Sequence, residues 1–84
     1  MKGKHLKTLQ SVFAKPTRTS VVFADLEALV LSLGGEIIQR GGSRMAFVLN
    51  QGRLDMHRPH PGKEARRYQV EELRACLTHL EITP

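Results

Sequence analysis

The chain has 84 residues, a length that allows one domain with a modest hydrophobic core. Hydrophobic residues make up 40% of the chain and charged residues 25%, a balance that is ordinary for a globular protein and argues against intrinsic disorder. The net charge of +5, from 13 Lys and Arg against 8 Asp and Glu, favours a phosphate-bearing partner. The single cysteine excludes an intramolecular disulfide, and no apolar run is long enough to span a membrane, so we expect a cytoplasmic protein without a membrane partner.

Two helices are predicted in the first half of the chain. The first covers residues 4–14 and ends before Pro16, whose ring excludes the helical conformation at the preceding residue. The second begins at residue 23 and ends before Gly34, which supplies a left-handed conformation after the helix. Their apolar faces comprise Leu6, Leu9 and Phe13 in the first helix and Leu26, Leu29, Val30 and Leu33 in the second.

Three short β-prone runs follow, at residues 36–40, 44–50 and 53–58. Gly-Gly-Ser separates the first two runs and Gln-Gly the last two, at the spacing of β-hairpins. Because side chains alternate between the two faces of a strand, we expect Met45, Phe47, Leu49, Leu54 and Met56 to face the core. The alternation places Arg53, Asp55 and His57 on the opposite, solvent-exposed face.

A last helix is predicted over residues 68–79, where Val70, Leu73, Leu77 and Leu80 form an apolar stripe. The complete order of elements is therefore α-α-β-β-β-α. Without the first helix, this is the order of the double-stranded-RNA-binding domain, whose two helices cover one face of an antiparallel sheet. We predict a single α+β domain over residues 1–84, with an N-terminal helical extension (1–20) and an αβββα core (21–84).

The connection DMHRPHPGKEARR, residues 55–67, concentrates the side chains that indicate function. RNA is cut without a metal when a base removes the 2′-hydroxyl proton and cations stabilise the charge that develops on the phosphate. His57, at the exposed end of the third strand, has the side chain suited to such proton transfer and is our candidate catalytic residue. A surface histidine, or one that contacts phosphate without catalysis, is the alternative for this residue.

The basic side chains of this region are candidates for phosphate contact. The predicted nucleic-acid-binding residues are Arg44, Arg58, His60, Lys63, Arg66 and Arg67, with Arg53 in the same basic set. The amides at the start of the last helix also favour a phosphate. Tyr68 is the one exposed aromatic candidate for base stacking, so backbone contact is favoured over reading of bases.

No metal and no other cofactor is expected. His57 and His60 lie on an extended segment at a spacing poorly suited to one shared ion, and only Asp55 is near them in the sequence. The Gly-Gly-Ser segment joins two strands instead of opening a helix, so a hairpin turn is favoured over a phosphate-binding loop.

Three stretches together resemble the HicA toxin family, in a variant with an added N-terminal helix. They are KHLKTLQSVFAKP, FADLEALVLSLGGEIIQRGGSRMAFVLN and HRPHPGKEARRYQVEELRACL, and they cover nearly the whole chain. The resemblance implies a double-stranded-RNA-binding-like fold and a metal-independent endoribonuclease, an mRNA interferase that blocks translation. It also implies a partner, a HicB-type antitoxin that covers the active face.

The chain departs from the family pattern at one position. Members of the family usually carry a catalytic histidine directly after the Gly-Ser turn, whereas Gly42-Ser43 is followed here by Arg44. One hypothesis is an endoribonuclease in which His57 has taken over this task. The other is a non-catalytic RNA-binding module, or a HicA-like protein that has lost its nuclease activity. A DNA-binding helix-turn-helix is disfavoured, because the second helix leads into Gly-Gly and a strand.

Overall fold

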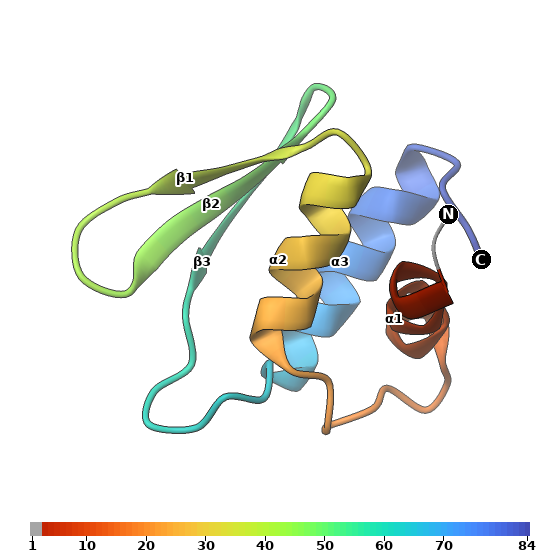
Figure 1. The fold of residues 1–84 in the computed structure, drawn as a ribbon, viewed down its shortest axis with the longest axis horizontal. Coiled ribbons are helices and arrows are strands. Elements are labelled where there is room, and N and C mark those ends of the chain that lie inside the picture. Colours follow the sequence, from red (N-terminus) through yellow and green to blue (C-terminus); the bar gives the residue numbers. More distant parts are fainter. Residues whose placement is uncertain (1–2) are drawn as a thin grey trace.

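The computed structural model describes residues 3–84, which form three helices and a three-stranded antiparallel sheet (Figure 1). The elements are α1 (Gly3–Phe13), α2 (Phe23–Ser32), β1 (Glu36–Gln39), β2 (Arg44–Leu49), β3 (Gly52–His57) and α3 (Arg67–His79). The predicted α+β class and the α-α-β-β-β-α order are confirmed, with every element within one residue of its predicted bounds. No helix within residues 3–84 has the length and apolar character needed to cross a membrane.

The three elements α2, β1 and β2 meet closely at a pair of glycines. Gly34 follows the last residues of α2 with a φ of +88°, the left-handed conformation that the sequence predicted. At Gly35, a Cβ atom would lie 2.7 Å from the Val48 carbonyl oxygen and 2.7 Å from Cγ1 of Val30. A side chain at this position would therefore separate the end of α2 from the sheet.

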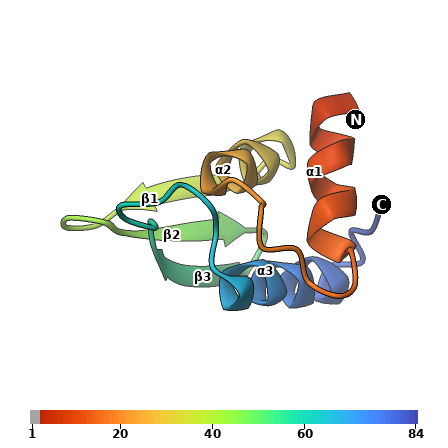
Figure 2. The ribbon, with the colours of Figure 1, turned by 90° about the horizontal axis from the view of Figure 1, so that it is seen from below.

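The helices form two layers on one side of the sheet. The strand order is β1-β2-β3, and α2 and α3 cover the same face (Figures 1 and 2). Helix α1 packs against α2 and α3 on their far side and makes no contact with the strands (Figure 2). The opposite face of the sheet is not covered by any element within residues 3–84.

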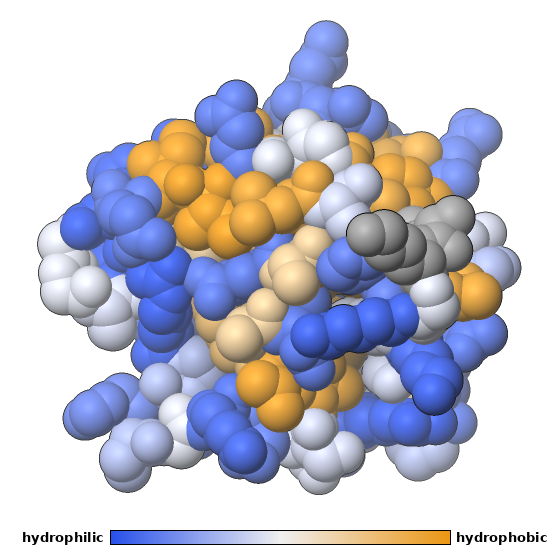
Figure 3. Space-filling view, in the orientation of Figure 1, coloured by the Kyte–Doolittle hydropathy of each residue, from blue (hydrophilic) through white to orange (hydrophobic). Residues whose placement is uncertain are grey.

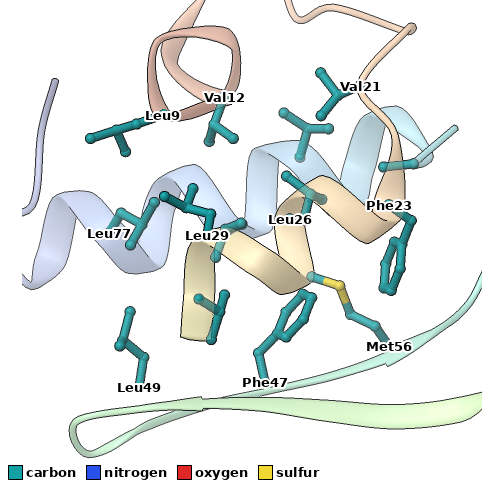
Figure 4. Packing of buried hydrophobic residues seen from close by; sticks show 14 of the residues in the cluster. Leu9, Val12, Val21, Phe23, Leu26, Leu29, Phe47, Leu49, Met56 and Leu77 are labelled. Carbon is teal, nitrogen blue, oxygen red and sulfur yellow. The ribbon is translucent and has the colours of Figure 1, made fainter. Parts of the chain in front are cut away.

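The core lies between the sheet and the two helices and continues beneath α1 (Figure 4). Phe47 of β2 stacks on Phe23 of α2 with ring centroids 5.6 Å apart and an interplanar angle of 21°. Leu9 and Val12 of α1 reach the same core from the other side of α2 and α3. The strands contribute Met45, Phe47, Leu49, Leu54 and Met56, the residues predicted to face the core.

A half-buried arginine of α3 fastens the end of α1. Arg74 Nε donates a hydrogen bond to the Val12 carbonyl at 2.8 Å, and its Nη2 donates to the Ala14 carbonyl at 3.3 Å and to Thr17 Oγ1 at 2.8 Å. The Thr17 hydroxyl in turn donates to Glu71 Oε2 at 2.8 Å. The last carbonyls of a helix have no partner within the helix, so a cation from α3 both satisfies them and complements the helix dipole.

We expect Arg74→Met to loosen α1 while the sheet stays folded. Methionine keeps an unbranched apolar stem and a similar helix propensity but removes three hydrogen bonds from a charged donor, each contributing about 1.5–3 kcal/mol. Hydrogen exchange should show faster exchange of the α1 amides, with unchanged protection in β2. Equal protection of α1 in both proteins would contradict this role for Arg74.

Candidate functional site

The uncovered face of the sheet carries polar side chains that the strand pairing arranges in rows. Arg44 pairs with His57, Ala46 with Asp55 and Val48 with Arg53, while Ile38 and Glu36 of β1 extend the last two rows. Arg53, Asp55 and His57 are all exposed, as the alternation in the sequence predicted. Met56, which is buried, and Leu54, which is partly buried, face the helices instead.

Arg44 and His57 are direct neighbours across two strands. The Arg58 N–H donates to the Ser43 carbonyl at 2.8 Å. Because hydrogen-bonded and non-hydrogen-bonded pairs alternate along an antiparallel ladder, the next pair, Arg44 and His57, is a non-hydrogen-bonded pair. Side chains approach most closely in pairs of this kind, with Cα atoms about 4.5 Å apart. The guanidinium of Arg44 and the imidazole of His57 therefore share one spot on the exposed face.

A second arginine continues this row. The Arg40 N–H donates to the Arg44 carbonyl at 2.9 Å, so the pairing of β1 with β2 extends one position past the end of β1. The turn between the strands contains Gly42 with a φ of +62°. Arg40, Arg44 and His57 are thus placed side by side by one hairpin and one strand pair. We call these three residues the cationic row.

A shallow groove of about 370 Å³ follows the cationic row. It is lined by Arg40, Arg44, Met45, Arg53, Asp55, Met56 and His57. Within it, Arg53 Nη2 lies 3.2 Å from Asp55 Oδ1, an exposed ion pair of the kind that contributes about 0–1 kcal/mol. In Figure 3 the left margin, where the β1–β2 turn lies, shows hydrophilic and near-neutral residues, with a hydrophobic patch to their right. The groove can accept an anion beside an imidazole.

Arg58 lies on the other face of the sheet from the cationic row. Its Nε and Nη2 donate to Glu27 Oε2 of α2 at 3.1 and 2.7 Å, and its Nη1 donates to Gln39 Oε1 at 2.7 Å. The guanidinium is therefore occupied between α2 and β1. This differs from the expectation that Arg58 and Arg44 hold phosphates together, because successive residues of an extended chain point to opposite faces.

A buried glutamine holds His57 from the side of α3. Gln69 is 1% exposed, its Nε2 donates to the His57 carbonyl at 2.7 Å, and its Oε1 accepts from the Arg66 N–H at 2.9 Å. Because β3 is an edge strand, the His57 carbonyl has no neighbouring strand on its outer side. Gln69 takes the place of such a strand and fixes the end of β3 to the start of α3.

The other predicted binding residues lie along the connection from β3 to α3. His60, Lys63, Arg66 and Arg67 are exposed there, and Tyr68 is 53% exposed at the start of α3. A groove of about 380 Å³ borders them and is lined by Thr19, Pro59, Pro61, Gly62, Glu64, Ala65, Arg66 and Arg67. These cations form a second group below the sheet, distinct from the cationic row.

Sequence reasoning missed three residues of this site, namely Arg40, Gln69 and Glu27. Arg40 could have been found from the hairpin, since three turn residues place it opposite Arg44. Gln69 also had a signal, because glutamine three residues after the helix-capping position commonly bonds back to the cap backbone. Glu27 had none, since its partner Arg58 is 31 positions away.

The far end of the molecule carries the remaining groups with chemical potential. A groove of about 600 Å³ is lined by Asn50, Gln51, Gly52, Cys76, His79 and Leu80. Burial raises the pKa of the Cys76 thiol above its usual value, which disfavours the reactive thiolate. Among residues 3–84, no three His, Cys, Asp or Glu side chains are grouped so as to hold a metal ion.

The αβββα core with its one uncovered sheet face defines an α+β domain with the element order of double-stranded-RNA-binding domains. The family model described as the HicA toxin of bacterial toxin-antitoxin matches residues 23–82, and the chain belongs to this family. Membership identifies a toxin that works with an antitoxin partner. Comparisons with curated proteins and with solved structures give no match. The matched region begins at Phe23, the first residue of α2, so α1 and the connection from α1 to α2 lie outside the matched region.

We expect Gln69→Met to destabilise the fold by about 1–3 kcal/mol, because the His57 carbonyl and the Arg66 N–H both lose the partner of a part-buried hydrogen bond. Gln69→Glu tests one of the two hydrogen bonds alone, since a carboxylate still accepts from the Arg66 N–H but cannot donate to the His57 carbonyl. Urea unfolding should rank the wild type above both variants. Glu72→Gln, an exposed change on the same helix, is the control and should match the wild type. Equal stability of Gln69→Met and the wild type would contradict this structural role of Gln69.

Proposed function

We propose that this toxin is a metal-independent endoribonuclease that cuts mRNA in the cytoplasm and so blocks translation. One observation carries the proposal: His57 is the cross-strand partner of Arg44, the residue directly after the Gly-Ser turn. HicA toxins usually carry their catalytic histidine at that position. An imidazole at residue 57 therefore occupies the same pair, on the same face, as the usual one.

The cationic row supplies the residue types that metal-free RNA cleavage needs. With His57 as general base, the imidazole takes the 2′-hydroxyl proton and O2′ attacks its own phosphorus. The bond to the 5′-oxygen breaks, leaving a 2′,3′-cyclic phosphate on one fragment and, after this oxygen takes a proton, a 5′-hydroxyl on the other. Arg40 and Arg44 stabilise the negative charge that develops on the phosphate oxygens.

The exposed cations below the sheet extend the contact with the RNA backbone. We assign phosphate binding to Arg44 in the row and to His60, Lys63, Arg66 and Arg67 along the β3–α3 connection. Arg58, which bonds to Glu27 and Gln39, instead supports the strand end that carries His57. We further propose that the HicB-type antitoxin covers the uncovered sheet face, where acidic side chains would complement Arg40 and Arg44.

A second candidate function is RNA binding without cleavage. The observation that favours it is Arg44 itself, a cation at the position where the family usually has its histidine. A cationic row with two arginines and a single imidazole suits binding of phosphate as well as catalysis. Tight, salt-dependent RNA binding without cleavage over long incubation would select this function.

We expect His57→Ala to reduce RNA cleavage by about 10²–10⁴-fold, the usual contribution of a general base or acid. In the same background, Arg44→His should restore part of the activity, because it returns an imidazole to the same cross-strand pair. The measurement is cleavage of a labelled RNA in the presence of EDTA, together with growth and mRNA integrity after induction of the toxin alone.

His79→Ala is the matched control, since His79 is exposed at the far end of α3. It should leave cleavage and toxicity unchanged. Full toxicity of His57→Ala would remove His57 from catalysis while leaving the nuclease activity to other residues. Normal growth and intact transcripts with the wild-type toxin would reject the endoribonuclease altogether.

A further inference from the structure

The positive charge of the chain comes from its N-terminal part. Residues 1–22 contain five basic residues and no acidic one, namely Lys2, Lys4, Lys7, Lys15 and Arg18. Residues 23–82, the region that matches the family model, contain eight basic and eight acidic residues and are neutral. The net charge of +5 therefore belongs entirely to the segment that precedes the matched region.

Three of the eight cations in the neutral region already have partners in the fold. Arg53 pairs with Asp55, Arg58 with Glu27, and Arg74 bonds to the carbonyls at the end of α1. In the N-terminal segment, Lys4, Lys7, Lys15 and Arg18 are exposed. Its apolar side chains Leu9 and Val12 are buried in the core, while Leu6 is 38% exposed, so α1 offers solvent a mostly polar surface that is poorly suited to a membrane.

The connection from α1 to α2 lies directly against the connection from β3 to α3. The Phe23 N–H donates to the Lys63 carbonyl at 2.9 Å, and the Ala65 N–H donates to the Val21 carbonyl at 2.7 Å. Figure 2 shows the two connections side by side on the surface seen from below. Thr19 of the first connection lines the 380 Å³ groove together with Arg66 and Arg67 of the second. The two connections thus form one surface.

We propose that this surface extends the RNA-binding site beyond the HicA core, with Lys15 and Arg18 as phosphate contacts. The inference rests on the proposed RNA-binding function and adds a segment to it. On this path, an RNA strand leaves the cationic row, passes the β3–α3 connection, follows the groove beside Arg66 and Arg67, and reaches Lys15 and Arg18. The bonds from Arg74 and Thr17 hold this part of the chain in place, so little ordering entropy opposes the contact.

The test compares two double variants with the same loss of charge. Lys15→Gln with Arg18→Gln removes two cations from the proposed path, and Lys4→Gln with Lys7→Gln removes two from the first half of α1, away from the path (Figure 2). Lys15→Arg with Arg18→Lys retains the charge. The full-length toxin, carrying His57→Ala to prevent cleavage, is titrated with a labelled single-stranded RNA at several salt concentrations.

Two lost contacts to a single strand should lower the slope of log affinity against log salt by about 1.4. Between 50 and 200 mM salt, affinity of the parent should then fall about sevenfold more than affinity of the Lys15→Gln, Arg18→Gln variant. The Lys4→Gln, Lys7→Gln variant should keep most of the parental slope, and the charge-retaining variant all of it. Matching thermal unfolding curves would establish that all variants fold alike.

Equal losses in the two charge-removing variants would overturn the inference, because only net charge would then matter. An unchanged slope after Lys15→Gln and Arg18→Gln would overturn it as well. Loss of binding to anionic phosphatidylglycerol vesicles, with RNA binding intact, would assign the surface to a membrane and reject the RNA path. A parent protein that binds no RNA at all would reject the proposed function itself. This result differs from RNA binding that is unchanged by substitution of Lys15 and Arg18, which would reject only the further inference.

Discussion

The register between β2 and β3 is the constraint on which the candidate site depends. Met45 pairs with Met56 and Phe47 with Leu54, and these four side chains face α2 and α3. Because side chains alternate along a strand, burial of these residues forces Arg44 and His57 onto the uncovered face. A slip of one residue would place the imidazole in the core and a methionine in solvent. The packing of the core therefore decides where the cationic row lies.

The end of β3 is also held from the helical side, where an edge strand would otherwise fray. Gln69 binds the backbone of His57, while the next residue, Arg58, is fixed to α2 and β1 through Glu27 and Gln39. These bonds use side chains that face away from the groove. The fold thus positions the imidazole while Gln69, Arg58, Glu27 and Gln39 all stay out of the lining of the groove along the cationic row.

Local pattern was enough to predict the elements and the exposed side of the sheet. The periodicity of apolar residues gave the helices, and the turn residues with the alternation of β3 gave the position of His57. The roles of Arg58 and Arg74 depend on partners 31 and 62 positions away, so no local pattern contains them. From the sequence alone, a basic residue that stabilises the fold cannot be distinguished from one that binds a ligand.

The difference between structural cations and cations free to bind a ligand affects how the net charge of the chain should be interpreted. Arg58 and Arg74 bind partners within the fold, so the number of basic residues in the αβββα core overstates the attraction of this core for a polyanion. Among residues 3–84, the exposed cations that have no acidic partner lie in the row, along the β3–α3 connection and in the N-terminal segment. Long-range attraction follows net charge, whereas affinity follows local contacts with phosphates. Under the proposed function, the positively charged extension supplies long-range attraction for the RNA, and the neutral core orients the reacting phosphate.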